Sequence, residues 1–216
     1  MISHIDTNKV MLIWGCGGHG RSVSNVAQRL GFRKVLFIDP GARHNESVNE
    51  IPVYSDFDCM SVAEGFGSND CVAIPCNGNS DLRFKQLSAI EALGLELRSV
   101  ISQRASVSPT SSIAGGVFVG DFCHVGPRSN IGRAVILNTG SIVEHDSSIG
   151  ELSHVSVNAA VCGNSKVGSR TMIGAGSTVI DSVTISSDVT VAAGACVVSD
   201  LTLKGLYKGV PAKFSG

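Results

Sequence analysis

The fold is decided by the stretch LNTGSIVEHDSSIGELSHVSVNAAV, residues 137–161, in which an aliphatic residue recurs at every sixth position. A period of six is neither the 3.6 of an α-helix nor the 2 of an ordinary strand. Ile101 already lies in this register, one step before its main run. That run is Val107, Ile113, Val119, Val125, Ile131, Leu137, Val143, Ile149, Val155, Val161, Val167, Ile173, Val179, Ile185, Val191 and Val197.

This period predicts a parallel β-helix of triangular cross-section, in which three hexads complete a coil of about 18 residues. The aliphatic residues point inward, and sixteen hexads give about five coils. Small or β-branched residues follow four positions later and suit tight corners. Glycines directly after the aliphatic residue, such as Gly126 and Gly150, are expected to allow the backbone angles of the corners. A β-sandwich is disfavoured, because irregular strands do not hold one register for about 90 residues.

The chain before the repeat has the pattern of a small α/β unit. Glycines end its helices, and strands alternate with helices as in a Rossmann-like half domain. The expected strands are at 10–14, 34–38, 71–74 and 95–100, and the expected helices at about 21–30 and 80–93. The sequence therefore predicts two domains, residues 1–100 and 101–216. The period ends after Val197, and the tail that contains Pro211 is expected to cap the β-helix, because proline cannot continue a ladder.

A glycine-rich motif follows the first expected strand. Gly15, Gly17 and Gly20 fit G-x-G-x-x-G, and Asp39 ends the next strand about 20 residues later. Backbone N–H groups at a helix N-terminus bind anions, so a nucleotide or phosphorylated ligand is expected near Gly17, Gly18 and His19. A tight turn without a ligand is the alternative. A dinucleotide-dependent dehydrogenase is disfavoured, because four strands make only one mononucleotide-binding half.

Composition narrows the functional classes. With 17 Lys+Arg against 18 Asp+Glu the net charge is −1, which disfavours nucleic acid as a partner. The apolar stretch near the start, residues 10–14, is far short of the ~20 residues that span a bilayer, so a cytoplasmic protein without membrane contact is expected. The seven cysteines show neither Cys-x-x-Cys nor zinc-ligand spacing, and we expect reduced thiols and no metal.

The hexapeptide repeat and the opening motif Gly15-Cys-Gly-Gly-His-Gly20 together resemble the sugar acetyltransferases of the left-handed β-helix superfamily. The resemblance covers nearly the whole chain and is most specific over residues 137–157, with support from 209–213. The subgroup includes sialic-acid O-acetyltransferases and the N-acetyltransferases of UDP-linked 4-amino-6-deoxy sugars in bacillosamine synthesis. It implies a left-handed β-helix, acetyl-coenzyme A as co-substrate, and a homotrimer with active sites between subunits.

The resemblance also implies roles for individual residues. His145 matches the general base, and Asp146 matches the acidic residue that tunes it, although the amino-sugar enzymes often have Glu there. The positions implied for acetyl-coenzyme A are His154, Ala175, Ala193 and Gly163, of which Gly163 is also a candidate oxyanion donor. The positions implied for the nucleotide sugar are Gly17, Gly18, His19, Asp39, Asn77 and Asn138.

The hexad register agrees with these roles. Val143 points inward, which places His145 clear of the aliphatic core, and His154 directly precedes the inward Val155. His124 also faces outward, and the residues alone do not rank it below His145. A neutral imidazole suits removal of a proton from an amine near neutral pH. No serine or cysteine lies in a nucleophile-elbow pattern, which favours direct attack over an acyl-enzyme.

The sequence thus predicts an acetyl-coenzyme A dependent N-acetyltransferase acting on the 4-amino group of a UDP- or dTDP-linked 4-amino-4,6-dideoxy sugar. Two alternatives remain open at this point. One is a sialic-acid O-acetyltransferase, which differs in its acceptor. The other is a non-catalytic, trimeric nucleotide-sugar-binding scaffold, in which replacement of His145 would change nothing.

Overall fold

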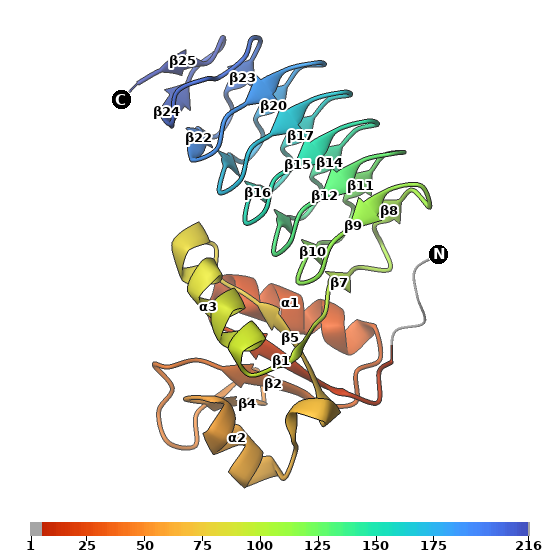
Figure 1. Cartoon of the computed structure of the whole chain (residues 1–216), viewed down its shortest axis with the longest axis vertical. Coiled ribbons are helices and arrows are strands. Elements are labelled where there is room, and N and C mark those ends of the chain that lie inside the picture. The colour runs from red at the N-terminus through yellow and green to blue at the C-terminus, as the bar shows by residue number, and fades with distance from the viewer. Residues whose placement is uncertain (1–5, 216) are drawn as a thin grey trace. The chain divides into compact units, whose positions relative to one another are not determined.

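The computed structural model describes residues 6–215 (Figure 1), so the outermost residues of the two expected domains lie outside the described part. The chain forms two compact units that meet between Val100 and Ile101. Within the described residues no helix has the length and apolar character needed to cross a membrane.

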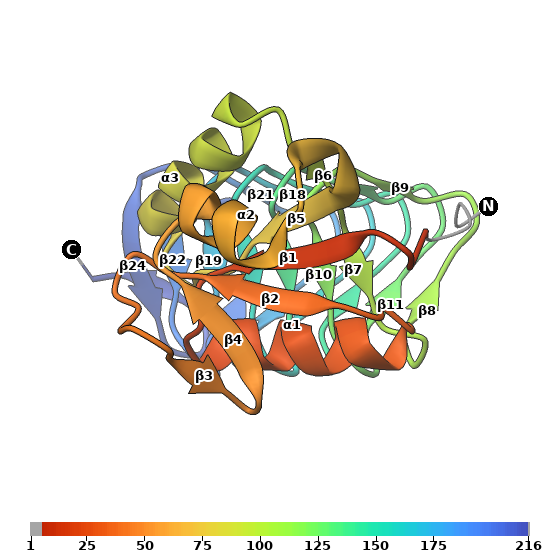
Figure 2. The same ribbon diagram turned by 90° about the horizontal axis from the view of Figure 1, so that it is seen from below.

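The first unit is a six-stranded sheet with β1 near its centre, between β2 and β5 (Figure 2). All neighbouring strands are parallel except the hairpin of β3 and β4. The sheet order is β3 (Ser47–Val48), β4 (Ile51–Tyr54), β2 (Val35–Ile38), β1 (Val10–Trp14), β5 (Cys71–Pro75) and β6 (Glu96–Leu97). The helices are α1 (Gly18–Arg29), α2 (Phe57–Glu64), the short 3-10 helix η1 (Ser68–Asp70) and α3 (Ser80–Ala92).

The expected α/β half domain is present, with three differences in detail. Helix α1 begins at Gly18, about three residues earlier than expected, because Gly20 packs against the carbonyl of Gly15, where a Cβ would collide. The sequence analysis missed the β3–β4 hairpin and α2, a short helix whose N-cap Asp56 accepts a hydrogen bond from the Cys59 amide. The strand expected at 95–100 divides into β6 and the first strand of the next unit.

The second unit is a left-handed parallel β-helix with three faces (Figure 1). Each strand pairs with the strand 18 residues later, as Val125 does with Val143. The first face contains β7 (Val100–Ile101), β10 (Phe118–Val119), β13 (Ile136–Leu137), β16 (His154–Val155), β19 (Met172–Ile173), β22 (Val189–Val191), β24 (Gly205–Lys208) and β25 (Lys213–Phe214). The second face contains β8 (Ser106–Val107), β11 (His124–Val125), β14 (Ile142–Val143), β17 (Ala160–Val161), β20 (Thr178–Val179) and β23 (Cys196–Val197). The third face contains β9 (Ser112–Ile113), β12 (Asn130–Ile131), β15 (Ser148–Ile149), β18 (Lys166–Val167) and β21 (Thr184–Ile185).

The aliphatic series forms the core of this β-helix. From Val119 to Val197 every member of the series is at most 3% exposed, which confirms that the period marks inward positions. Only the early members Val107 and Ile113 are partly buried. The tail also confirms the expected break in the repeat: β24 adds a parallel strand beside β22, β25 turns back antiparallel to it, and Pro211 lies between the two.

The glycines after the aliphatic residues do not have the role that the sequence suggested. The left-handed corner residue comes two positions later and is often not glycine, as with Asp146 at φ 60°. Glycine is needed instead because the next coil passes close by. A Cβ on Gly126 would lie 2.6 Å from the amide nitrogen of His145, and one on Gly150 would lie 2.5 Å from that of Ser169.

The small residues at the corners carry a second function that the sequence did not reveal. Buried hydroxyls connect one coil to the next: Ser165 Oγ donates to the carbonyl of Ile180 at 2.9 Å and accepts from the amide of Val183 at 3.3 Å. The hydroxyls buried at this position of the repeat belong to Ser129, Ser141, Ser147, Ser153, Ser165, Thr171 and Ser177.

We expect Ser165→Ala to lower the free energy of unfolding by about 1–3 kcal/mol, because it leaves a buried carbonyl and a buried amide without their partner. Ser165→Thr is the matched control, since Thr171 already occupies an equivalent corner and donates to Ser186 O at 3.0 Å. Urea unfolding midpoints measure both variants. Equal midpoints for Ser165→Ala and wild type would show that the hydroxyl does not stabilise the stack.

Candidate active site

His145 lies at the corner that follows β14, where the chain leaves the second face. Val143 turns into the core, so the His145 side chain projects outward and is 56% exposed. Its Nδ1 lies 2.9 Å from Oδ2 of Asp146. The short aspartate therefore reaches the imidazole, and its left-handed φ of 60° is one that Asp adopts more readily than most residues.

The second oxygen of the Asp146 carboxylate is held from the preceding coil. Arg128 Nη2 lies 2.7 Å from Asp146 Oδ1. The hydrogen bond from Arg128, and then that from His145, lower the pKa of Asp146 below its ordinary value. An ionised carboxylate at Nδ1 favours the tautomer with hydrogen on Nδ1, which leaves the lone pair of Nε2 available to accept a proton.

Gly163 lies one coil beyond His145 and forms the surface on which the imidazole rests. A Cβ there would lie 2.6 Å from Cε1 and 2.7 Å from Nε2 of His145, and 3.1 Å from Oδ1 of Asp181. The missing side chain thus makes room for the Nε2 edge of the ring. The sequence analysis placed Gly163 with the coenzyme residues and overlooked Asp181, although both follow His145 at multiples of the 18-residue coil.

The other residues assigned to the coenzyme lie on a different face. His154 belongs to β16 on the first face, and Nδ2 of Asn138 is 3.2 Å from its Nε2. Ala175 and Ala193 are exposed and stacked at the corner that follows the first face, where the Gly194 amide donates to the Ala175 carbonyl. Within one chain, His145 and Gly163 are therefore separated from this set by the turn of the coil from one face to another.

His124 has a weaker environment than His145. It projects from β11 on the second face, and its Nε2 lies 3.9 Å from Oε1 of Glu144, too far for a hydrogen bond. Glu144 also accepts from the backbone amide of His145 at 3.3 Å. The geometry thus ranks His145 above His124 as a base, a distinction that the residues alone did not make.

In the first unit the glycine motif forms the N-terminus of α1. Gly17 is the N-cap residue, Gly17 and Gly18 are exposed, and His19 lies half-buried in the first turn. Asp39 at the end of β2 accepts hydrogen bonds at 3.0 Å from the amides of Cys16 and Gly41. Burial opposes ionisation of Asp39, but these two amides outweigh it and lower its pKa. Asp39 therefore orders the glycine loop, whatever else it binds.

The loop after β5 lies beside the glycine loop at the carboxyl ends of the central strands. A Cβ on Gly15 would lie 2.7 Å from the carbonyl oxygen of Cys76. Asn77 Oδ1 accepts from the amide of Asn79 at 2.9 Å. Arg83, a buried residue of α3 that the sequence analysis did not single out, donates to the carbonyl oxygens of Asn77 and Gly78 at 2.5 and 3.1 Å. A buried cation thus fixes the loop that carries Asn77.

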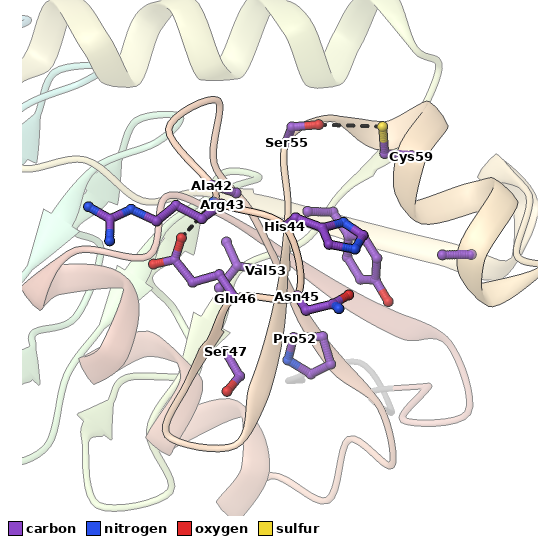
Figure 3. A pocket seen from close by; sticks show the side chains of 12 residues that line it. Ala42, Arg43, His44, Asn45, Glu46, Ser47, Pro52, Val53, Ser55 and Cys59 are labelled. Carbon is purple, nitrogen blue, oxygen red and sulfur yellow. Dashed lines mark hydrogen bonds between the residues drawn. The ribbon is translucent and has the colours of Figure 1, made fainter.

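A pocket opens farther along the same sheet, between the loop that precedes β3, strand β4 and the start of α2 (Figure 3). Arg43, His44 and Glu46 line it, and the Arg43 amide donates to Glu46 Oε2 at 2.8 Å. None of the residues assigned to the nucleotide sugar lines this pocket. The sequence offered only a polar loop here, which did not distinguish a pocket from ordinary surface.

The structure shows no sign of metal or disulfide chemistry in the part of the chain that it describes. No group of three His, Cys, Asp or Glu side chains within residues 6–215 is placed to hold a metal ion. All seven cysteines are free thiols; three of them are buried, and Cys59 is exposed.

Comparisons with known proteins place the chain in a family. Residues 10–87 match the family described as PglD N-terminal domain. The acetyltransferase domain of PglB from Neisseria gonorrhoeae is 31% identical, with a TM-score of 0.89 over 96% of this chain and 100% of that one, and it has also been solved with acetyl coenzyme A. Perosamine N-acetyltransferase from Caulobacter crescentus, a variant of which was solved with CoA and GDP-perosamine, is 32% identical, with a TM-score of 0.88 over 95% of this chain and 96% of that one.

WeeI from Acinetobacter baumannii shares the fold at 16% identity, with a TM-score of 0.68 over 96% of this chain and 100% of that one. No curated protein sequence matches the chain. The likeness to the two acetyltransferases spans both units and meets the expectation drawn from the hexapeptide repeat and the glycine motif. The chain is an acetyltransferase and belongs to the left-handed β-helix sugar acetyltransferases of the bacillosamine-pathway type.

Proposed function

We propose that this protein transfers the acetyl group of acetyl-coenzyme A to the 4-amino group of a nucleotide-linked 4-amino-4,6-dideoxy sugar, with His145 as the general base. The observation that carries the proposal is the contact of His145 Nδ1 with the Asp146 carboxylate, at 2.9 Å, which leaves Nε2 as a proton acceptor. The perosamine N-acetyltransferase solved with CoA and GDP-perosamine supports a nucleotide-linked acceptor.

The residues can divide the reaction as follows. Acetyl-coenzyme A supplies a thioester carbonyl. Nε2 of His145 accepts the proton that the acceptor nitrogen loses as the new C–N bond forms, and it returns that proton to the thiolate when the C–S bond breaks. The amide of Gly163, directly beside Nε2, is the proposed donor to the developing oxyanion, since the amides on either side of it already donate to Val179 O and His145 O.

The coenzyme and sugar residues fit this proposal if the chain acts as a homotrimer. His145 and Gly163 lie at the corner after the second face, whereas His154, Asn138 and Ala175 lie on or beside the first face. A neighbouring copy can bring its first face to this corner, and the exposed Ala175 would let the coenzyme pass close to the backbone. The glycine loop with His19 and Asp39 would hold the nucleotide sugar, together with Asn77.

We further propose that the protein works in the cytoplasm. The seven free thiols fit a reducing compartment, because pairs of cysteines persist as disulfides mainly in oxidising ones.

The test is thiol release from acetyl-coenzyme A, followed with a disulfide reagent, against UDP-, dTDP- and GDP-linked 4-amino-4,6-dideoxy sugars and sialic acid. A blank without acceptor corrects for the protein's own seven cysteines. We expect turnover with one nucleotide-linked amino sugar and an N-acetylated product by mass spectrometry. Turnover on sialic acid alone would make the protein an O-acetyltransferase, and nucleotide binding without any turnover would make it a scaffold.

A further inference from the structure

The carboxylate that contacts His145 is bound from two sides. Its Oδ2 lies 2.9 Å from the imidazole, and its Oδ1 lies 2.7 Å from Arg128 on the preceding coil. Arg128 and Asp146 are 18 residues apart and occupy the same left-handed corner position, at φ 57° and 60°. One coil thus delivers a guanidinium to the carboxylate that the next coil presents to the histidine.

This arrangement limits how the carboxylate can turn. An Asp side chain at an exposed corner rotates freely about its Cα–Cβ and Cβ–Cγ bonds and can leave the imidazole for solvent. A guanidinium on Oδ1 holds the carboxylate plane, so that Oδ2 stays on Nδ1 of His145. The imidazole in turn keeps one tautomer and one orientation, with Nε2 directed over Gly163.

An ion pair between adjacent coils is not by itself a sign of function. Arg170 and Asp188 form the same pair at another corner of the β-helix, with the same 18-residue spacing, φ values of 53° and 60°, and contacts of 2.7 Å. No histidine contact is recorded for that pair among the described residues. It is therefore a matched control for whatever such a pair contributes to folding alone.

We propose that Arg128 is a positioning residue for the transfer reaction: it acts through Asp146 to keep the His145 imidazole in its reactive orientation. Arg128 itself does not contact the reacting atoms in this proposal. The inference rests on the proposed role of His145 as the base.

The experiment compares Arg128→Gln with Arg170→Gln in steady-state kinetics and in thermal unfolding. We expect Arg128→Gln to lower kcat about tenfold, within the range of couplings between contacting residues, with the KM of both substrates unchanged. Arg170→Gln should leave kcat at the wild-type value. Both variants should unfold at the wild-type temperature, because exposed ion pairs contribute little to stability.

Two further variants show whether the effect passes through the carboxylate. Arg128→Lys keeps a cation near Oδ1 and should recover most of kcat. In an Asp146→Asn background, Arg128→Gln should cause no additional loss, since the group on which it acts is gone.

Several results would overturn the inference. A rise in the KM of either substrate at unchanged kcat would make Arg128 a substrate-binding residue. Losses that add fully in the Asp146→Asn background, or an equal loss in Arg170→Gln, would also contradict a positioning role. His145→Ala separates the two levels: if it keeps wild-type turnover, the proposed base fails together with this inference, but if only Arg128→Gln keeps turnover, the base stands and the positioning role alone is wrong.

Discussion

Replacement of His145 by alanine should lower kcat with the amino-sugar acceptor by about 10²–10⁴-fold, the usual contribution of a positioned general base. An amine near neutral pH must lose a proton to complete the transfer, and no other imidazole in the described β-helix has a carboxylate within hydrogen-bond distance in the recorded contacts. The KM for acetyl-coenzyme A should change little, because the ring acts on the reacting nitrogen. Steady-state kinetics of thiol release measure both constants.

His124→Ala is the matched control for this variant. His124 also projects from the second face and also has a carboxylate nearby, but that carboxylate is 3.9 Å away. We expect its kcat to stay within about threefold of wild type, since it lacks the hydrogen bond that fixes a tautomer. A large loss in His124→Ala together with a small one in His145→Ala would assign the base to His124 instead.

Gly163→Ala should lower kcat by about 10- to 100-fold while the protein stays folded. The new methyl group would lie 2.6–2.7 Å from Cε1 and Nε2 of His145, so the ring must move. Displacement of a reacting group by about 1 Å can cost a factor of 10². The ring is the free end of an exposed side chain, so it moves at little cost in stability, and the thermal unfolding temperature should remain close to that of wild type.

This variant also separates two roles of Gly163. Alanine keeps the backbone amide, so an oxyanion contact from that amide survives the substitution, whereas the space for the ring does not. A wild-type kcat in Gly163→Ala would show that the imidazole does not need its place over Gly163. An unfolding temperature far below wild type would show that the Cβ disturbs the coil backbone and not only the ring.

The β-helix could be predicted almost completely from the sequence. Its core positions from Val119 to Val197 are buried as the six-residue period requires, and the 18-residue pairing follows from three hexads per coil. The α/β unit was predicted less fully. Helix α2 is short and capped by Asp56, and β3 has only two residues, so neither carries enough periodicity to be recognised.

The candidate site shows the same division. Outward placement of His145 and its neighbour Asp146 followed from the register, and the resemblance singled out His145 among the outward histidines. The assignment of Gly163 to the coenzyme overlooked its contact with the imidazole, and the sequence analysis passed over Arg128 and Asp181. All three lie at multiples of 18 residues from His145 or Asp146, so the coil length already contained the signal that they are neighbours.

By itself the sequence determined the architecture, because burial of an aliphatic residue every six positions leaves only one regular way to coil the chain. Only the tertiary structure decided how neighbouring coils touch. Glycine follows the aliphatic residue where the next backbone comes too close for a Cβ, as at Gly126. The Arg128 guanidinium meets Asp146 because both corner residues are left-handed and aim their side chains alike. Such contacts depend on corner angles and side-chain rotamers, which hydrophobic periodicity does not specify.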